Sequence, residues 1–288
     1  MADITIRKRA REGNVSILDK LFWSVQPPGG MICGDYYRAE NYFAPHFPGD
    51  EGYHGILEVV NRAGRLVMVE FNEINATSYY IRRYQGVSKR LSDYSFFQAG
   101  KARTAQTGVV LVNGLTHLEK QMLEENRLTG EFDLLTGASN SIRRSMLPLA
   151  EQIARRLDQP SGETYYGLAK PLEPGITGRL QVVCGEGRLQ RFHYDEIFAD
   201  RQEEIEDPEL KPYYRQSKYD APDYISTAGI GFNTLVDYLR CAVLERQDLL
   251  DLDGLPFTRE PRRAEEWDRY LSLAEEVWSK IQEDGALG

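Results

Sequence analysis

The chain has 288 residues, a formal net charge of −9 and 41% hydrophobic residues. This length is enough for two ordinary domains or one large one, and the hydrophobic content is enough for sizeable cores. Because acidic residues outnumber basic ones, attraction to a phosphate backbone is weak, which argues against a nucleic-acid-binding protein.

The cysteines Cys33, Cys184 and Cys241 match no metal-binding spacing, and their odd number argues against a disulfide framework. We therefore expect isolated thiols in a reducing compartment and no metal site. Charge arrives early, at Arg7, and no run approaches the ~18 apolar residues of a membrane span. These features predict a cytoplasmic protein with neither an export signal nor a membrane span.

The first part of the chain shows little regular patterning. A short amphipathic stretch from Val15 to Trp23 precedes a turn signal at residues 26–30, and an aromatic-rich segment follows at residues 36–47. We interpret residues 1–50 as an irregular covering arm packed on the body of the protein.

Two β-hairpins follow, with turns at residues 61–64 and 184–187. A shift of 123 residues superimposes the two segments without a gap. The shift aligns Gly55 with Gly178, and it also aligns further identical residues: Leu57 and Leu180, Val59-Val60 and Val182-Val183, Gly64-Arg65-Leu66 and Gly187-Arg188-Leu189, Glu73-Ile74 and Glu196-Ile197. A match over this length predicts an internal duplication.

Helical spacing of apolar residues predicts one helix at residues 108–125. The second copy shows no room for this helix between Tyr219 and Asp223. A loop and a helix then follow in each copy, at 133–157 in the first and at 223–246 in the second. A final amphipathic helix is expected at 263–282.

The predicted fold class is therefore α+β, with two tandem copies of a β-hairpin/sheet unit and packed helices, the second copy being shortened. The predicted domains are a covering arm at residues 1–50, a first domain at 51–160, a second, degenerate domain at 161–250 and a C-terminal docking helix at 251–288.

The segment Asp133–Ser141 carries most of the polar groups that could bind a ligand. Gly137 lets the backbone turn, Thr136, Ser139 and Asn140 supply hydroxyl and amide groups, and a helix begins directly afterwards. The free N–H groups and positive dipole end of a helix start favour a phosphate. Because the same residue types are ordinary helix N-caps, the local pattern leaves a capping role open.

The string Asp133-x-x-Thr136-Gly137-Ala138-Ser139 resembles the flavinylation motif of the FMN-binding domain family. That family includes covalent-flavin subunits of sodium-pumping NADH:quinone oxidoreductases and of Rnf complexes, and flavin-carrying lipoproteins. The resemblance implies that a flavin transferase joins FMN, through its phosphate, to Ser139. It also implies that the cofactor-binding residues are Asp133, Leu135, Thr136, Gly137, Ala138, Ser139 and Asn140. The second copy departs from the motif, with Gly229 at the hydroxyl position.

Two functions remain open from the sequence. The first is an FMN-binding electron-transfer protein, attached covalently or not, that exchanges electrons with an unidentified redox partner and converts no substrate itself. The aromatic stretches at 36–47 and 79–97 would then line the flavin-binding site. The phosphate or the ring of the flavin would be bound by Arg82, Arg83, Lys89 and Arg90. The second is a relative of such domains that has lost its cofactor and serves as a scaffold or binding module.

Overall fold

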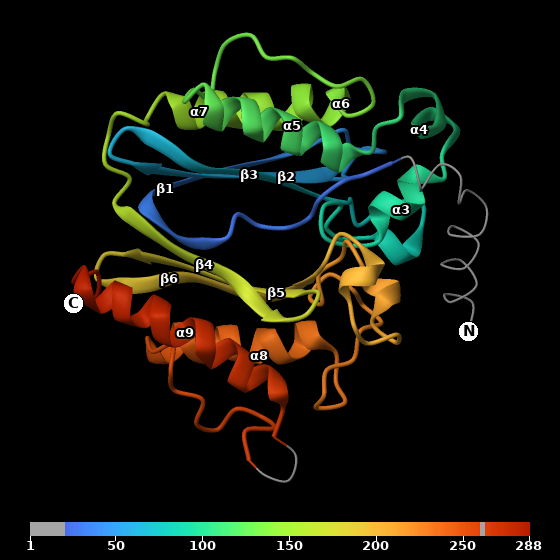
Figure 1. Ribbon diagram of the computed structural model, residues 1–288. Coiled ribbons are helices and arrows are strands. Elements are labelled where there is room, and N and C mark those ends of the chain that lie inside the picture. Colours follow the sequence, from blue (N-terminus) through green and yellow to red (C-terminus); the bar gives the residue numbers. More distant parts are fainter. Residues whose placement is uncertain (1–20, 260–262) are drawn as a thin grey trace. The chain divides into compact units, whose positions relative to one another are not determined.

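The structure is a computed structural model that describes residues 21–259 and 263–288 (Figure 1). The predicted amphipathic stretch at Val15–Trp23 lies largely outside the described residues. The fold is α+β, as predicted, with six strands hydrogen bonded in the order β3-β2-β1-β4-β5-β6. The chain divides into two compact units, unit 1 (residues up to 25, 37–59 and 65–158) and unit 2 (residues 26–36, 60–64 and 159–288).

Unit 1 is built from the second part of β1 (Gly30–Phe43), most of β2 (Tyr53–Arg62), and β3 (Arg65–Ile74). Helix α5 (Leu111–Glu124) packs on β3, and α7 (Leu147–Ala154) joins the same core. The shorter helices are η1 (Arg82–Tyr84), α3 (Tyr94–Ala99), α4 (Ala102–Thr107), α6 (Ser139–Ser141) and the π-helical η2 (Ile142–Met146).

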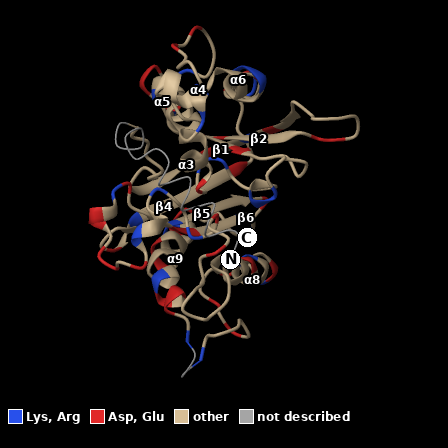
Figure 2. Ribbon diagram, turned by 90° about the vertical axis from the view of Figure 1, so that its right-hand side faces the viewer, with Lys and Arg blue, Asp and Glu red and all other residues tan. Residues whose placement is uncertain are grey.

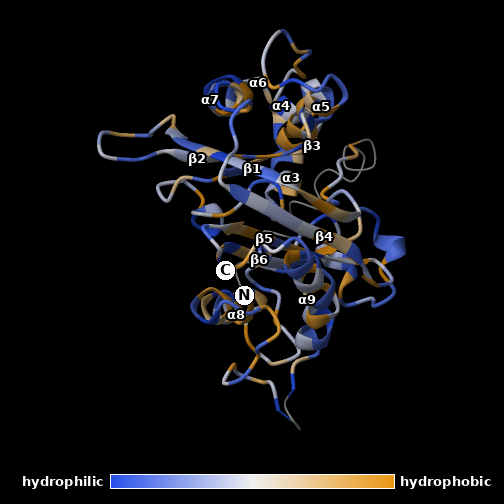
Figure 3. Cartoon of the chain, turned by 90° about the vertical axis from the view of Figure 1, so that its left-hand side faces the viewer, coloured by the Kyte–Doolittle hydropathy of each residue, from blue (hydrophilic) through white to orange (hydrophobic). Residues whose placement is uncertain are grey.

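Unit 2 contains the antiparallel strands β4 (Glu163–Glu173), β5 (Ile176–Gly185) and β6 (Arg188–Phe198). Helix α8 (Phe232–Arg246) packs on β6, and α9 (Glu265–Glu283) packs on β4 and β5. Both helices are amphipathic, with hydrophobic and hydrophilic residues alternating along their lengths (Figure 3). Two 3-10 turns, η3 (Gln202–Glu204) and η4 (Lys211–Tyr213), lie between β6 and α8.

Both predicted hairpins are confirmed, and the same turn closes each of them. Ala63 and Gly64 have φ values of 52° and 81°, and Glu186 and Gly187 have φ values of 53° and 70°. Positive φ at both central residues defines the type I′ turn, whose twist matches that of paired strands. The Gly at the second position accepts this conformation without the strain that a Cβ would bring.

The N-terminal segment differs from the sequence-based expectation. Residues 30–43, which we expected to be irregular, form β1, and Gly30–Asp35 pair with residues 164–169 of β4. The strand was missed because its aromatic residues, Tyr36 and Tyr37, are adjacent rather than alternating, and both are buried.

Each hairpin is joined to a helix by a similar contact. Leu66 N–H donates to Asn126 Oδ1, just after α5, at 2.7 Å, and Leu189 N–H donates to Gln247 Oε1, just after α8, also at 2.7 Å. These bonds lie where α5 packs on β3 and where α8 packs on β6.

Among the described residues, no helix is long and apolar enough to cross a membrane.

Candidate functional site

The loop 133–138 lies along α5 and is fixed to it at both ends. Gln121 Nε2 donates to the carbonyl oxygen of Asp133 at 2.8 Å, and Asp133 N–H donates to Gln121 Oε1 at 2.9 Å. At the other end, Ala138 is buried against Gly114, where an added Cβ would come within 2.0 Å of the Ala138 Cβ. The small residues at 114 and 138 therefore permit an approach that larger side chains would prevent.

The turn before the helix requires glycine. Gly137 has a φ of 116°, and a Cβ there would lie 3.1 Å from Thr107 Oγ1 and 3.3 Å from the Val109 carbonyl oxygen. The carboxylate of Asp133 remains largely exposed, 3.6 Å from His117 Nε2. Thr136 is exposed and Leu135 is half-buried. The loop backbone is thus anchored at both ends, while the side chains of Asp133 and Thr136 lie at the surface.

The helix that follows has no side-chain cap. Its N-cap residue is Ala138, and no side chain bonds to the free N–H groups of the first turn. Ser139 is half-buried and Asn140 is exposed. The capping role that the sequence left open for these residues is therefore not found, and the N–H groups of this helix start are not capped by the loop.

The next turn of the same helix is irregular and basic. Residues Ile142–Met146 are π-helical. This form is rare in proteins overall, but it occurs frequently at functional sites. Asn41 braces this turn, because its Nδ2 donates to the Arg144 carbonyl oxygen at 3.2 Å and its Oδ1 accepts from Ser145 Oγ at 2.6 Å. Arg143 and Arg144 are both exposed, and basic residues are visible beside α6 in Figure 2.

Three of the four cations that we expected to face a ligand are paired within unit 1, including Arg83, whose Nη2 lies 3.1 Å from Asp93 Oδ2. Lys89 is buried and paired with Glu73, and Arg90 is buried with its Nη1 2.5 Å from Glu119 Oε1. Burial raises the pKa of Glu119, although the charge of Arg90 opposes the shift.

The aromatic stretch at 79–97 forms a packed group within unit 1. Tyr79, Tyr84 and Tyr94 form a buried cluster, in which Tyr84 and Tyr94 rings lie 5.3 Å apart edge to face. The hydroxyl oxygens of Tyr79 and Tyr94 are 3.2 Å apart. These rings pack mainly on one another, while Tyr80 beside them is 69% exposed.

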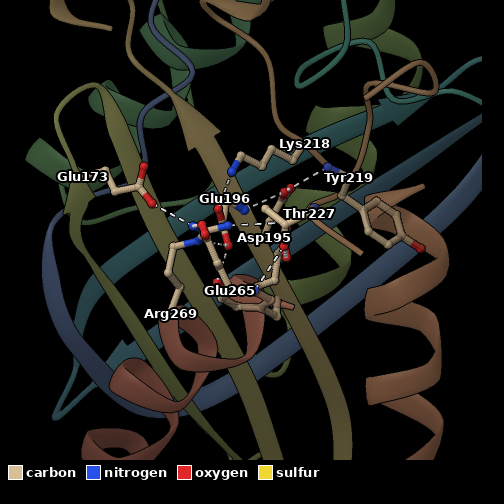
Figure 4. A network of polar contacts seen from close by, with 10 residues as sticks. Glu173, Asp195, Glu196, Lys218, Tyr219, Thr227, Glu265 and Arg269 are labelled. Carbon is tan, nitrogen blue, oxygen red and sulfur yellow. Dashed lines mark hydrogen bonds and ion pairs between the residues drawn. The ribbon is translucent and has the colours of Figure 1, made fainter. Parts of the chain in front are cut away.

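Unit 2 contains a buried ion-pair network at the end of β6 (Figure 4). Glu196 is fully buried and binds Lys218 Nζ at 2.6 Å and Arg269 Nε at 3.0 Å. Burial by itself would raise the pKa of Glu196, but the charges of Lys218 and Arg269 hold it below its usual range. Burial by itself would lower the pKa of Lys218, but the charge of Glu196, the charge of Tyr224 and the hydrogen bond to Glu196 together raise it above its usual value.

Asp195, next to this network, is a buried carboxyl group without a cationic partner at short range. Its Oδ1 accepts from the N–H groups of Glu196 and Tyr219, at 2.8 and 3.1 Å, and its Oδ2 lies 3.9 Å from His193 Nε2. Burial, and then the charge of Asp220, raise the pKa of Asp195 to about 8. Asp195 is therefore largely protonated at neutral pH.

From the sequence, Glu73 and Glu196 are expected only to mark the ends of the two hairpins. The signal that could have revealed their buried pairs is the dipeptide Ser-Lys, which occurs at 88–89 and again at 217–218. Lys89 N–H donates to the Glu73 carbonyl oxygen at 2.8 Å, and Lys218 N–H donates to the Glu196 carbonyl oxygen at 2.8 Å. The two lysines thus meet the two glutamates through the same backbone contact.

Comparison with known proteins gives little further guidance. No family model and no curated protein matches the chain. Among solved structures, the CPE2226 protein from Clostridium perfringens matches with 19% identity over 43% of this chain and 88% of its own, at a TM-score of 0.31.

Proposed function

We propose that this chain is an FMN-binding electron-transfer protein whose loop 133–141 holds the flavin phosphate. The observation that carries the proposal is the helix start after Ala138, which has no side-chain cap, beside the hydroxyl and amide groups of Thr136, Ser139 and Asn140. Uncapped N–H groups and the positive end of the helix dipole together favour a phosphate at this place.

Arg143 and Arg144 add positive charge within one turn of the proposed phosphate site. Both side chains are exposed, so neither is committed to the protein core. Arginine binds phosphate oxygens through two parallel hydrogen bonds, which makes this residue type well suited to the role. In the proposal, these residues replace Lys89 and Arg90, which the ion pairs of unit 1 occupy.

We also propose that the two units arose by duplication, on the strength of bonds that recur at matched positions. Ser88 Oγ accepts from Leu91 N–H, and Ser217 Oγ accepts from Asp220 N–H. Isolated bridges join Ile74 to Ser88 and Ile197 to Ser217. Such agreement follows naturally from a shared ancestral unit, in which only the first copy retains the motif at 133–139.

The experiment is to produce the protein in the cytoplasm, its proposed location, alone and together with a flavin transferase, and to record the visible spectrum and the intact mass. We expect a yellow protein, and with the transferase a mass increase that corresponds to one FMN. Ser139→Ala should abolish the covalent increase, whereas Ser141→Ala, two residues further along the helix, should not. A colourless chain of unmodified mass, even after titration with FMN, would overturn the proposal.

The role of the arginines is tested by noncovalent FMN titration. Replacing Arg143 and Arg144 together with glutamine should weaken FMN binding more than it weakens riboflavin binding, because riboflavin lacks the phosphate. Arg155→Gln, an exposed change on the same helical segment, is the matched control. An equal loss of affinity for FMN and for riboflavin would show that these arginines do not bind the phosphate.

One observation favours a second function, that of a cofactor-free scaffold or binding module. The tyrosines at 79–94 pack on one another, and Lys89 and Arg90 are paired internally, so these side chains have protein partners without a cofactor. The same spectrum and mass measurements decide between the two functions. The scaffold requires that neither flavin nor a mass increase is found.

A further inference from the structure

The end of β3 in unit 1 buries polar atoms that have no protein partner. Glu73 and Asn75 are 1% and 2% exposed, and Asn75 directly follows the last residue of β3. Among the described residues, no hydrogen-bond partner meets Glu73 Oε2, Asn75 Nδ2 or Asn75 Oδ1. Buried polar groups almost always have a partner, so three such atoms on two neighbouring residues indicate a binding function.

Tyrosine rings lie beside the Glu73–Lys89 ion pair. Lys89, which pairs with Glu73, has its Nζ 3.9 Å from the centre of the Tyr53 ring and 5.3 Å from that of Tyr94. Tyr79 lies between these two rings, with centroid distances of 6.3 Å to Tyr53 and 6.0 Å to Tyr94. Flat aromatic surfaces beside a polar group suit a planar ligand with a polar edge.

Unit 2 closes the matched position with its own side chains. Glu196, which the 123-residue shift aligns with Glu73, has partners on both oxygens: Tyr194 and Arg269 on Oε1, and Lys218 on Oε2. The same shift places Phe198, which is fully buried, where unit 1 has Asn75. In unit 2, therefore, Arg269 pairs with the aligned glutamate and Phe198 replaces the asparagine, so these two positions carry no polar atom without a partner.

The second cation of unit 2 comes from α9, whose Arg269 Nε donates to Glu196 Oε1 at 3.0 Å. Among the described residues, no cation takes the corresponding place at Glu73 Oε2.

We propose that Glu73 and Asn75 form a subsite for a planar ring that carries an amide or imide edge. The Asn75 side chain offers one donor and one acceptor, which complement an adjacent C=O and N–H, and Glu73 Oε2 accepts from a further N–H group or a bound water. Lys89 compensates the charge of Glu73. Tyr53, whose ring lies beside Lys89, is half-buried and is the ring of the tyrosine group nearest to solvent.

In FMN, the pyrimidinedione end of the flavin has this hydrogen-bonding pattern, and this assignment rests on the proposed function. The ring subsite is nevertheless separable from the phosphate site at 133–141, because lumiflavin has the same ring edge without a phosphate. The two proposals therefore fail independently.

The test measures binding of lumiflavin and of N3-methyl-lumiflavin to the full chain by calorimetry. We expect lumiflavin to bind and the N3-methyl compound to bind at least about tenfold more weakly, since an N–H donor is lost and its acceptor stays buried. This comparison requires no variant, so a folding defect cannot obscure it.

Two variants then place the site. Asn75→Asp, which keeps the shape but removes the donor, and Asn75→Phe, which copies Phe198, should each reduce lumiflavin affinity at least about tenfold. Asn233→Asp, in unit 2, is the matched control and should leave the affinity unchanged. Thermal melting verifies that each variant is folded.

The outcomes separate the proposals. If FMN binds but lumiflavin does not, or if N3-methylation and Asn75→Asp change nothing, the ring subsite is overturned while the FMN proposal stands. If lumiflavin binds as expected but FMN binds no more tightly, the phosphate site fails and the ring subsite stands. A crystal structure with ordered water only at Glu73 and Asn75, together with no binding of either lumiflavin, would also overturn the subsite.

Discussion

Replacing Asp195 with asparagine should make the stability of this protein less dependent on pH. Asp195 is 1% exposed, and its pKa is raised from 3.8 to about 8 by burial and by Asp220. In the unfolded chain the carboxyl group ionises near its ordinary pKa. Between pH 4 and pH 8, therefore, the folded state holds one proton that the unfolded state has released.

The sign and size follow from proton linkage. A carboxyl group whose pKa is raised on folding stabilises the protein fully below its unfolded pKa and loses that contribution as pH rises towards the folded pKa. The free energy of unfolding should fall by about 1.4 kcal/mol per pH unit in this window. Between pH 5 and pH 7 the loss amounts to roughly 3 kcal/mol, a large part of the stability of a typical domain.

The assay is urea unfolding of the natural protein and of Asp195→Asn at pH 5, 6 and 7. Asparagine keeps the acceptor for the N–H groups of Glu196 and Tyr219 and cannot ionise. The difference between the two proteins isolates Asp195 from other titrating groups, including His193. As pH rises, the free energy of unfolding of Asp195→Asn should increase relative to that of the natural protein. Parallel pH profiles for the two proteins would refute the assignment of a protonated, buried Asp195.

Three further outcomes follow from the packing. Lys218→Met should destabilise the protein by about 3–5 kcal/mol in urea, because it removes one partner of the buried Glu196; a loss under 1 kcal/mol would mean that water or Arg269 compensates. Gly114→Ala should clash with Ala138 and lower the melting temperature, at a cost of about 1–3 kcal/mol. Combining it with Ala138→Gly should restore the melting temperature. If Gly114→Ala alone leaves the melting temperature unchanged, the loop shifts freely. Gly64→Ala should cost about 1 kcal/mol, because its φ of 81° strains any side chain, and equal urea midpoints would argue against the type I′ turn.

Local patterning determined several elements of this protein correctly. Alternation around a glycine turn located both hairpins, and helical periodicity located α5, α8 and α9. These signals are strong because each element must bury one face, and the spacing of its apolar residues records which face that is.

Tertiary structure alone decided the remaining features. Asp195, Glu196 and Lys218 look like surface residues in the sequence, since charged side chains usually are, and only folding brings β6 and the segment after it together around them. The orphan amide of Asn75 is invisible in the sequence for the same reason. A strand hidden among adjacent aromatics, such as β1, also depends on its neighbours, because long-range hydrogen bonds rather than local periodicity define it.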